Sequence, residues 1–523
     1  MSKATIFPKY EIAKGNEVWQ KNLELIKLSA SKVRSSLGPK GSFKMVVYNR
    51  GPEQVIKVTK DPVPILNEIS IQSPMATVAL EAVKLQREET GDGAISFLIL
   101  LEGLLKGAEE MKAMKIHPNT IIRGYLEATK RALNGIDALS SEIGEESYDM
   151  FLEAVDCGRD FLTDDLRRSV IEACRSAVVA GRLEKEKVRI LKKPGGCMSD
   201  SYLIHGITIK KERAHPNMPA YMEGLRVAVL STKFGVNRLE ILMKGEGRFP
   251  MKLKIDDPGR MSEFAAARHE LIRAQLEKLE SLNVNLLVCE QLIDDKIKGE
   301  LARAGIFALE RVDRVDSREL ACATGASVVG DINDMSPSDV GRAECLEVGK
   351  IGLESTVTVS GCGGTTLVLR GNTSQALEEL ESTVKRCVTV MKLAMAGGHA
   401  VPAGGATELC LARDLRKYSL GFPGKEQLAI QYFASALQDV PWCLAENFGL
   451  DPSTAIGQLA KHLEAHGNKG GYGICEDGCA EIGYLDIAEA KSAAVRRAYE
   501  TARFLLKIDM VWHHKEIAKF HKK

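Results

Sequence analysis

The chain has 523 residues, which at about 100–200 residues per domain predicts about three domains. Its 45% hydrophobic and 27% charged residues are the ordinary balance of a globular protein with a sizeable core. Basic and acidic residues number 71 and 70, so the formal net charge of +1 gives no electrostatic reason to expect nucleic acid or an anionic membrane as a partner.

The cysteines and the N-terminus indicate a compartment. Twelve cysteines are scattered along the chain, and only Cys475 and Cys479 lie close together, so a zinc site is not indicated and free thiols in a reducing compartment are expected. The first residues, MSKATIFPKYEIAKG, contain no apolar secretory core, and no apolar run approaches the ~20 residues of a membrane span. We therefore expect a cytosolic protein.

The first 140 residues are expected to be mostly helical. Apolar residues at helical spacing over 17–37 predict a helix that stops at Gly38-Pro39. Two short strands at 45–47 and 55–56 are expected around a turn at 49–52. Further helices are predicted from about residue 65, over 75–88, over 94–114 and over 119–136.

The middle of the chain has a different pattern. From residue 188 to about 371, short apolar runs such as LRVAVLST and NVNLLVCE alternate with helical patterns, which is typical of an α/β segment. After residue 373 the pattern is helical again. The sequence therefore predicts a multidomain α and α/β protein in which an α/β module is inserted between two halves of a helical region.

One short stretch suggests a phosphate site. In TGDGAIS (90–96), an aspartate between two glycines opens an apolar helix, where unpaired N–H groups and the helix dipole attract anions. An acidic residue shares such a site with phosphate when Mg²⁺ lies between them. Alone, this pattern fits many ordinary turns. Two further glycine turns, LGPKG (37–41) and VPAGGATE (401–408), and the strand end KVTKD (57–61) strengthen the interpretation.

Together with LAENFGLDP (444–452), these stretches occur in the order and spacing of one family. The chain resembles a divergent group II chaperonin subunit, of the thermosome and CCT/TRiC family, over essentially its whole length. GGCMSDSYLIHGITIKKE (195–212) and RGNT (370–373) are similar to the entry to and exit from the family's apical domain. The C-terminal half most resembles theta subunits of eukaryotic CCT, and zeta subunits come second.

The resemblance implies a chaperonin fold with three domains. A mostly α-helical equatorial ATP-binding domain would comprise 1–138 and 397–523. A small intermediate domain would comprise 139–206 and 360–396. An inserted α/β apical domain with a helical protrusion would comprise 207–359 and would bind clients.

The resemblance also implies ATP or ADP with Mg²⁺ as cofactors. Asp92 would be the Mg²⁺ ligand, and Asp61 would take part in hydrolysis. The nucleotide would lie against Leu37, Gly38, Pro39, Gly91, Asp92, Gly93, Ala94, Ile95, Ser96, Gly404, Gly405, Gly473 and Asp486.

Several positions depart from the family pattern. Ala94-Ile95 stands where the family has phosphate-bonding hydroxyls, and Pro62-Val63-Pro64 replaces Gly-Ala-Thr, which should stiffen a loop. Leu377, Leu380, Val384, Val388, Met391 and Met395 should form the buried stripe of one helix. Arg386 lies on its opposite face, where the family has a catalytic carboxylate, and an arginine does not act as a base at neutral pH. Region 154–166 also lacks the family's Thr-Ser…Lys pattern. We expect weak nucleotide binding and slow or absent hydrolysis.

Clients and partners follow from the resemblance. Pro258–Met261 resembles the protrusion tip, and Met261 and Phe264 are candidates for lid or client contact. Phe264, Leu271, Leu276 and Leu279 give the following helix an apolar stripe, which ordinary core packing would also explain. The polar helix 313–325 is either a charge-selective client surface or a solvated face.

The expected partners are paralogous subunits in a ring of eight, stacked as a double ring, and unfolded clients such as actin and tubulin. A hetero-oligomer is favoured because neighbouring subunits could supply the missing hydrolysis. A chaperonin-like adaptor outside a ring stays open as an alternative. The sequence holds no P-loop or kinase signature, which argues against a free-standing ATP-dependent enzyme.

Overall fold

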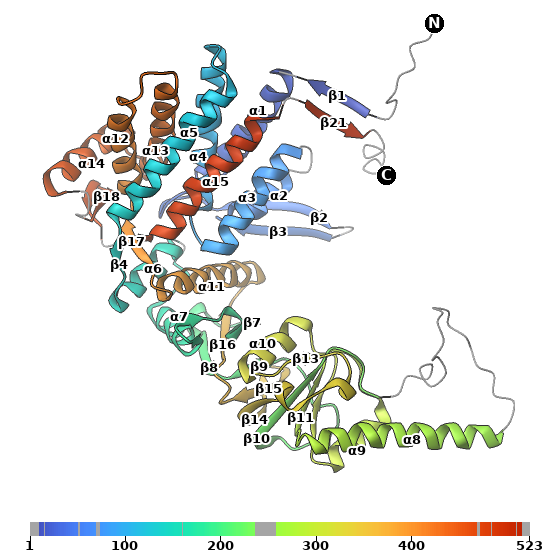
Figure 1. The fold of residues 1–523 in the computed structure, drawn as a ribbon. Coiled ribbons are helices and arrows are strands. Elements are labelled where there is room, and N and C mark those ends of the chain that lie inside the picture. The colour runs from blue at the N-terminus through green and yellow to red at the C-terminus, as the bar shows by residue number, and fades with distance from the viewer. Residues whose placement is uncertain are drawn as a thin grey trace, which may run out of the picture. The chain divides into compact units, whose positions relative to one another are not determined.

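The computed structural model describes residues 10–14, 16–50, 53–69, 74–158, 160–235, 258–467, 471–482, 484–508 and 510–514. It divides into two compact units, Met1–Arg167 with Ser374–Lys523 and Arg168–Thr373 (Figure 1). The chain thus leaves the first unit once and returns to it, as expected for an inserted module. The finer division into three domains stays a prediction.

The first unit is mainly helical. Its N-terminal part contains β1 (Tyr10–Lys14), α1 (Asn16–Arg34), β2 (Lys44–Arg50), β3 (Glu53–Thr59), α2 (Pro62–Ile69), α3 (Pro74–Thr90), α4 (Ala94–Ala113), α5 (Pro118–Leu139), β4 (Ser141–Glu142) and α6 (Tyr148–Asp156), and α7 (Asp164–Ser176) leads out of it. Its C-terminal part contains α11 (Ser374–Met395), β17 (His399–Pro402), α12 (Ala406–Ser419), α13 (Glu426–Phe448), α14 (Pro452–His466), β18 (Tyr472–Cys475), β19 (Gly478–Glu481), β20 (Leu485–Ile487), α15 (Ala488–Leu506) and β21 (Met510–His514).

Helix α4 is the centre of this unit's core. The apolar run FLILLEGLL lies on it, and most of its residues are buried against α1, α13 and α15. Two glycines allow α13 to approach closely, because a Cβ on Gly103 would lie 2.7 Å from Ala436 Cβ and one on Gly107 would lie 2.9 Å from Tyr432 Cβ. Within the described residues, no helix combines the length and the apolar character that a membrane crossing requires.

Short strand pairs join distant parts of the first unit. Strand β17 pairs antiparallel with β20 and with β4, so it links the segment after α11 to the segments before α15 and after α5. The strands β1 and β21, close to the two chain ends, also pair antiparallel (Figure 1). These pairings join the N-terminal and C-terminal parts of the first unit to each other.

One of the predicted departures has a different structure from the one expected. The segment Pro62-Val63-Pro64 is not a stiff loop but the first turn of α2. Proline is tolerated there because the first N–H groups of a helix have no intrahelical acceptor.

The second unit is built on β-sheet, as the alternating pattern predicts. The larger sheet has the order β12 (Phe307–Leu309), β11 (Leu286–Cys289), β10 (Tyr221–Leu230), β14 (Gly341–Ile351), β15 (Glu354–Ser360) and β9 (Ile207–Ile209), and β13 (Val328–Val329) pairs with the end of β10. Strands β10, β11 and β12 run parallel, with α8 (Pro258–Ser281) between β10 and β11 and α9 (Asp295–Arg303) between β11 and β12, and α10 (Arg314–Thr324) follows β12. The smaller sheet is β7 (Val188–Pro194), β16 (Thr365–Gly371) and β8 (Tyr202–His205), and β5 (Val178–Val179) and β6 (Arg182–Leu183) form a hairpin.

Helix α8 carries the residues expected at the protrusion. It begins at Pro258, but the side chains of Met261 and Phe264 lie outside the described residues, so their role in lid or client contact stays a prediction. The predicted apolar stripe is wrong at Leu271, which is 47% exposed. The buried face instead runs through Ile272 and Leu279, which lie seven residues, or two helical turns, apart.

Candidate functional site

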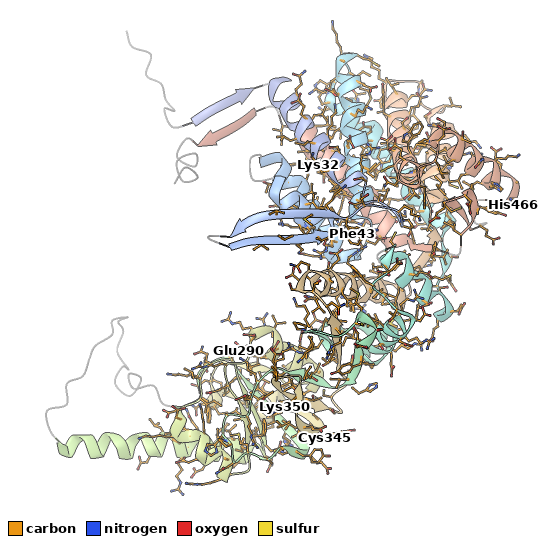
Figure 2. All side chains as sticks on the ribbon, turned by 180° about the vertical axis from the view of Figure 1, so that it is seen from behind. Lys32, Phe43, Glu290, Cys345, Lys350 and His466 are labelled. Carbon is orange, nitrogen blue, oxygen red and sulfur yellow. The ribbon has the colours of Figure 1, made fainter. Side chains whose placement is uncertain are left out.

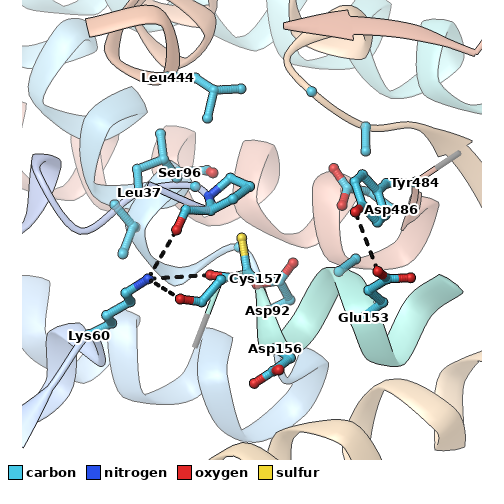
Figure 3. A pocket seen from close by; sticks show the side chains of 18 of the residues that line it. Leu37, Lys60, Asp92, Ser96, Glu153, Asp156, Cys157, Leu444, Tyr484 and Asp486 are labelled. Atoms are coloured by element: carbon cyan, nitrogen blue, oxygen red, sulfur yellow. Dashed lines mark hydrogen bonds between the residues drawn. The ribbon is translucent and has the colours of Figure 1, made fainter. Parts of the chain in front are cut away.

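The three glycine turns that the sequence singled out meet at one cavity of about 620 Å³ in the first unit. This volume lies in the range typical of small-molecule sites. Of the predicted site residues, the cavity is lined by Leu37, Gly38, Pro39, Asp61, Gly91, Asp92, Gly93, Ala94, Ile95, Ser96, Arg386, Gly404, Gly405 and Asp486. Figure 3 shows Leu37, Asp92, Ser96 and Asp486 around it, contributed by segments far apart in the sequence.

Glycine is needed at the starts of two helices that line the cavity. Gly93 precedes α4 with φ 77°, and Gly405 precedes α12 with φ 80°. Both values lie in the left-handed region, which residues with a Cβ rarely adopt. The two glycines therefore let each chain segment turn sharply from a loop into a helix.

Both helix starts offer backbone donors to the cavity. In α4 the first intrahelical bond runs from Phe97 N–H to Gly93 O (2.9 Å), and in α12 it runs from Leu409 N–H to Gly405 O (3.1 Å). The N–H groups of the first turn have no intrahelical acceptor, although Ala406 N–H of α12 already donates to Ala403 O (3.3 Å), and the positive ends of both helix dipoles lie there. Two helix N-termini at one cavity form a cradle suited to an anion such as phosphate.

Buried side chains hold the turns in place. Gln86 Nε2 donates to Asp92 O (3.1 Å) and to Ala490 O (3.0 Å), and Thr90 Oγ1 donates to Asp92 O (2.8 Å). Asn447 Nδ2 donates to Leu37 O at 2.8 Å and to Arg34 O. The LAENFGLDP stretch therefore acts by fixing the LGPKG turn.

One predicted residue lies beside the cavity rather than in its lining. Gly473 packs against Gly404, and a Cβ on Gly473 would lie 3.1 Å from Gly404 Cα. Its neighbour Ile474 donates its N–H to Gly404 O (3.0 Å), and Ile474 and Cys475 line the cavity instead. Gly473 thus supports the third turn, and a side chain there would be crowded, because its Cβ would also lie 2.2 Å from Ile482 Cδ1.

Asp61, the expected hydrolytic residue, has both carboxylate oxygens engaged. Oδ1 accepts the Val63 N–H (3.0 Å), which makes Asp61 the N-cap of α2, and Oδ2 pairs with Arg87 at 2.9 Å. The residue is only 4% exposed. Sequence reasoning missed Arg87, although it lies one helical turn before the GDG turn.

Lys60 is a second residue that sequence reasoning missed, although it directly precedes Asp61. It is only 2% exposed, and its ammonium donates to the carbonyls of Pro39, Cys157 and Gly158 at 3.3–3.4 Å (Figure 3). The ammonium also lies 5.0 Å from the ring centroid of Phe43, labelled in Figure 2. This cation therefore ties the LGPKG turn to the segment after α6.

Helix α11 brings Arg386 to the cavity. The expected stripe is buried except for Met395, which is half-buried. On the other face, Arg386 Nε donates to Gly91 O (2.9 Å), and Nη2 lies 3.3 Å from Asp92 Oδ1. Burial lowers the pKa of Arg386, but the carboxylates of Asp92 and Asp61 raise it to a net value above the ordinary one, so the guanidinium stays charged.

A further ion pair lies where the ribose-binding acid was expected. Asp486 Oδ2 accepts from Lys491 Nζ at 2.8 Å, and Glu408 also binds this ammonium. Burial lowers the pKa of Lys491, but the two carboxylates raise it above its ordinary range. Asp486 is therefore held in place by a partner that the sequence alone did not reveal.

The cavity's residues fit a nucleotide better than they fit a free metal ion. Two helix starts offer donors for phosphates, Asp486 offers an acceptor for a hydroxyl, and Leu37, Val440, Leu444 and Phe448 offer apolar surface for a base. Across the described ranges, no three His, Cys, Asp or Glu side chains form a metal-binding group. Asp92, the expected Mg²⁺ ligand, already faces the Arg386 guanidinium.

Comparison with known proteins adds an independent finding. The model of the TCP-1/cpn60 chaperonin family matches residues 30–516. A thermosome subunit of Methanocaldococcus jannaschii is 34% identical over 514 residues, which cover 95% of this chain and 92% of the relative. The thermosome subunit beta of Thermoplasma acidophilum is 33% identical over 516 residues, with 95% and 92% covered. The similarity spans both compact units.

Proposed function

The chain belongs to the TCP-1/cpn60 chaperonin family, and we propose on this premise that it is a nucleotide-binding subunit of a ring-forming chaperonin that binds unfolded proteins and assists their folding. The observation that carries the nucleotide part of this proposal is the convergence of three glycine turns, from residues 37–41, 91–96 and 403–405, on one cavity. No other role accounts so directly for two helix N-termini that open into the same space.

Different residues of the cavity would bind different parts of ATP or ADP. The first N–H groups of α4 and α12 would bind phosphate oxygens, and Asp486 would accept a hydrogen bond from the ribose. Bound ATP supplies a cleavable phosphoanhydride bond. Ala94 and Ile95 bring no hydroxyl to the phosphates, and each missing bond to a charged group costs about 1.5–3 kcal/mol, so we expect modest affinity.

We further propose that this subunit hydrolyses ATP slowly or not at all. A general base must carry a free lone pair at the reacting water. Arg386 offers none, and each carboxylate oxygen of Asp61 already has one partner, Val63 N–H or Arg87, which leaves fewer lone pairs for a reacting water. The charged residues of this region thus support binding more than proton transfer.

Steady-state ATP turnover of the purified assembly tests this part of the proposal. Arg386→Asp places a carboxylate on the α11 face that lines the cavity, and we expect hydrolysis at this subunit's own site to rise by at least about tenfold, at the low end of general-base effects, and turnover of the assembly to rise by the share of that site. Lys385→Asp, on the exposed side of the same helix, is the matched control. Equal turnover in Arg386→Asp and the unaltered assembly would contradict the proposed loss of hydrolysis.

The assembly that we propose is a hetero-oligomeric double ring of eight subunits per ring in the cytosol. Neighbouring subunits would supply the hydrolysis that this one lacks, as the likeness to eukaryotic CCT theta subunits also suggests. The clients would be unfolded proteins such as actin and tubulin, contacted through the α8 region that contains Met261 and Phe264.

An adaptor acting outside a ring is the second candidate, because the proposed loss of hydrolysis would also suit a protein that only binds. The particle mass separates the two. Sixteen chains of 57.1 kDa give about 0.9 MDa, whereas an adaptor would run as a monomer or small complex. Native mass measurement of the protein purified with its partners, followed by binding of chemically denatured actin, would decide between them.

A further inference from the structure

The guanidinium of Arg386 contacts a different part of the cavity from the side chains of Arg87 and Lys491. Arg87 pairs with Asp61, and Lys491 pairs with Asp486, both outside the GDG turn. Arg386 bonds the GDG turn itself with its guanidinium, through Gly91 O and Asp92 Oδ1, whereas Arg87 contacts that turn through its backbone carbonyl, which accepts the Gly91 N–H (2.9 Å). Arg386 therefore places a fixed positive charge at the turn whose N–H groups face the anion cradle.

The backbone of α11 makes this placement rigid. A Cβ added to Gly91 would lie 2.7 Å from Arg386 O, so the helix and the turn are in direct contact. On the same face of α11, Ser382 accepts a hydrogen bond from Arg87 (2.9 Å), and Glu379 accepts one from Thr59 (2.6 Å). These contacts hold α11 on the cavity wall within the first unit.

The contacts of Arg386 leave part of its guanidinium for a ligand. Nε and Nη2 each make a bond within the protein, and a guanidinium carries five N–H groups in a planar fork. Such a fork matches the spacing of phosphate oxygens. The arginine could thus donate to a phosphate without releasing the GDG turn.

The same placement disfavours a divalent metal at Asp92. Mg²⁺ takes oxygen ligands in a nearly regular octahedron and is usually held by one or two carboxylates together with substrate phosphates. Here Asp92 is the expected ligand, and Arg386 both occupies its Oδ1 and repels a second cation at close range. The resemblance leads us to expect a catalytic carboxylate at position 386, so the arginine there also removes a negative charge from the neighbourhood of Asp92.

We propose that Arg386 takes the place of Mg²⁺ at this site, so that the subunit binds the phosphates of ATP or ADP through a guanidinium and without a divalent cation. This inference rests on the proposed function, because it requires that the cavity holds a nucleotide. Arg386 would thus do more than remove an expected base, because it would also bind the phosphates.

Titration of the purified assembly with ADP tests the inference, because ADP binding needs no turnover. Binding is followed by hydrogen exchange in this chain's own 91–96 peptide, which excludes the sites of the neighbouring subunits. Each titration is made with excess Mg²⁺ and again with EDTA at the same ionic strength. For the unaltered protein, we expect the Kd to change by less than about threefold between the two conditions, since the arginine supplies the positive charge.

Three substitutions of Arg386 distinguish the effect of its positive charge on ADP binding from the effect of its size and shape. Without Mg²⁺, Arg386→Gln should weaken ADP binding by about tenfold or more, the loss expected for a charged hydrogen bond, and Arg386→Lys should keep most of the affinity. Arg386→Asp should bind ADP only when Mg²⁺ is present. Lys385→Gln is the matched control, because it removes one charge from the exposed side of the same helix. Circular dichroism of each variant checks that it folds.

The outcomes distinguish this inference from the proposed function. If the unaltered protein binds ADP with Mg²⁺ but loses about tenfold or more with EDTA, the inference is wrong and the nucleotide site stands. If Arg386→Gln binds ADP as tightly as the unaltered protein without Mg²⁺, the inference is also wrong. If the unaltered protein binds no nucleotide in either condition, the inference and the nucleotide part of the proposed function both fail.

Discussion

The glycine turns and the charged residues around α11 form two parts of one cavity wall, and they are held in place by different means. The turns keep their glycines, because Gly93 and Gly405 have φ near 80° and Gly91 contacts the backbone of α11. The charged part carries Arg386 where the resemblance leads us to expect a carboxylate, and the first turn of α2 carries two prolines, Pro62 and Pro64.

The difference reflects what each part is made of. A turn built from the backbone is constrained by sterics, since almost any side chain at such a position strains the chain. A part built from side chains changes without strain if each new charge finds a partner, and Arg386 finds Asp92 while Arg87 finds Asp61. The backbone turns and the charged side chains of this cavity are therefore free to change independently of each other.

The largest expected effect is on the glycine part. Gly91→Ala should lower the free energy of unfolding by about 3 kcal/mol, because it combines left-handed backbone strain with a contact of 2.7 Å to Arg386 O. It should also abolish ADP binding. Denaturant unfolding and ADP titration measure the two effects.

Gly449→Ala is the matched control for this variant. Gly449 also has positive φ (78°), but a Cβ there would have no atom within 4 Å. It should cost only about 1 kcal/mol of left-handed strain and leave ADP binding intact. Equal losses in the two variants would show that contact with α11 does not constrain the turn.

A buried carboxylate elsewhere in the first unit shows what a poorly compensated charge costs. Burial raises the pKa of Asp439 to about 6, from an ordinary value of 3.8, although Arg34 lies close enough to lower it. Since the folded pKa is the higher one, stability is fully present below pH 3.8 and is lost as the pH rises through about 6. The loss amounts to about 3 kcal/mol at higher pH.

Asp439→Asn should remove this dependence. The difference in unfolding midpoint between Asp439→Asn and the unaltered chain should grow in favour of the variant between about pH 4 and pH 8. Other titrating groups are common to both proteins and cancel in the difference. A difference that stays constant with pH would show that this carboxylate is compensated as well as those at the cavity.

The smallest expected effect is on stability and concerns the single hydrogen bond between Ser382 on α11 and Arg87 on α3. Ser382→Ala removes the hydroxyl that accepts from Arg87 Nη2, which should cost about 1 kcal/mol, because Arg87 keeps its pairing with Asp61. Thermal unfolding measures this loss. A cost of about 3 kcal/mol or more would mean that the helix is held mainly by this bond rather than by its buried stripe.

Some of this architecture could be predicted because it depends on local pattern. Glycines at helix starts, the period of α4 and the buried stripe of α11 all have signals within a few residues of sequence. The insertion of an α/β module was also predictable, because the hydrophobic pattern changes near residue 188 and changes back near residue 373.

The features of the site that the sequence does not predict depend on contacts between residues far apart in the chain. The partners of Arg386, Lys60 and Lys491 are set by how α11, the LGPKG turn and α12 pack together, and sequence spacing carries no signal for this. The sequence predicts Gly473 in the cavity lining, but the residue lies behind Gly404. This contact joins residues about 70 positions apart, and sequence spacing gives no signal for it. The sequence predicts Leu271 on the buried face of α8 because several apolar residues lie along this helix and more than one set of them could form the buried face. The structure buries Ile272 instead.

The central claim is that three turns distant in sequence hold one nucleotide. Hydrogen exchange of the purified assembly with and without saturating ADP tests it most directly, because the ligand would cover the N–H groups of all three. We predict slower exchange in peptides covering 37–41, 91–96 and 403–408, with β10 in the second unit unchanged. Protection at only one of the three turns, or at none of them while ADP binds, would contradict the account.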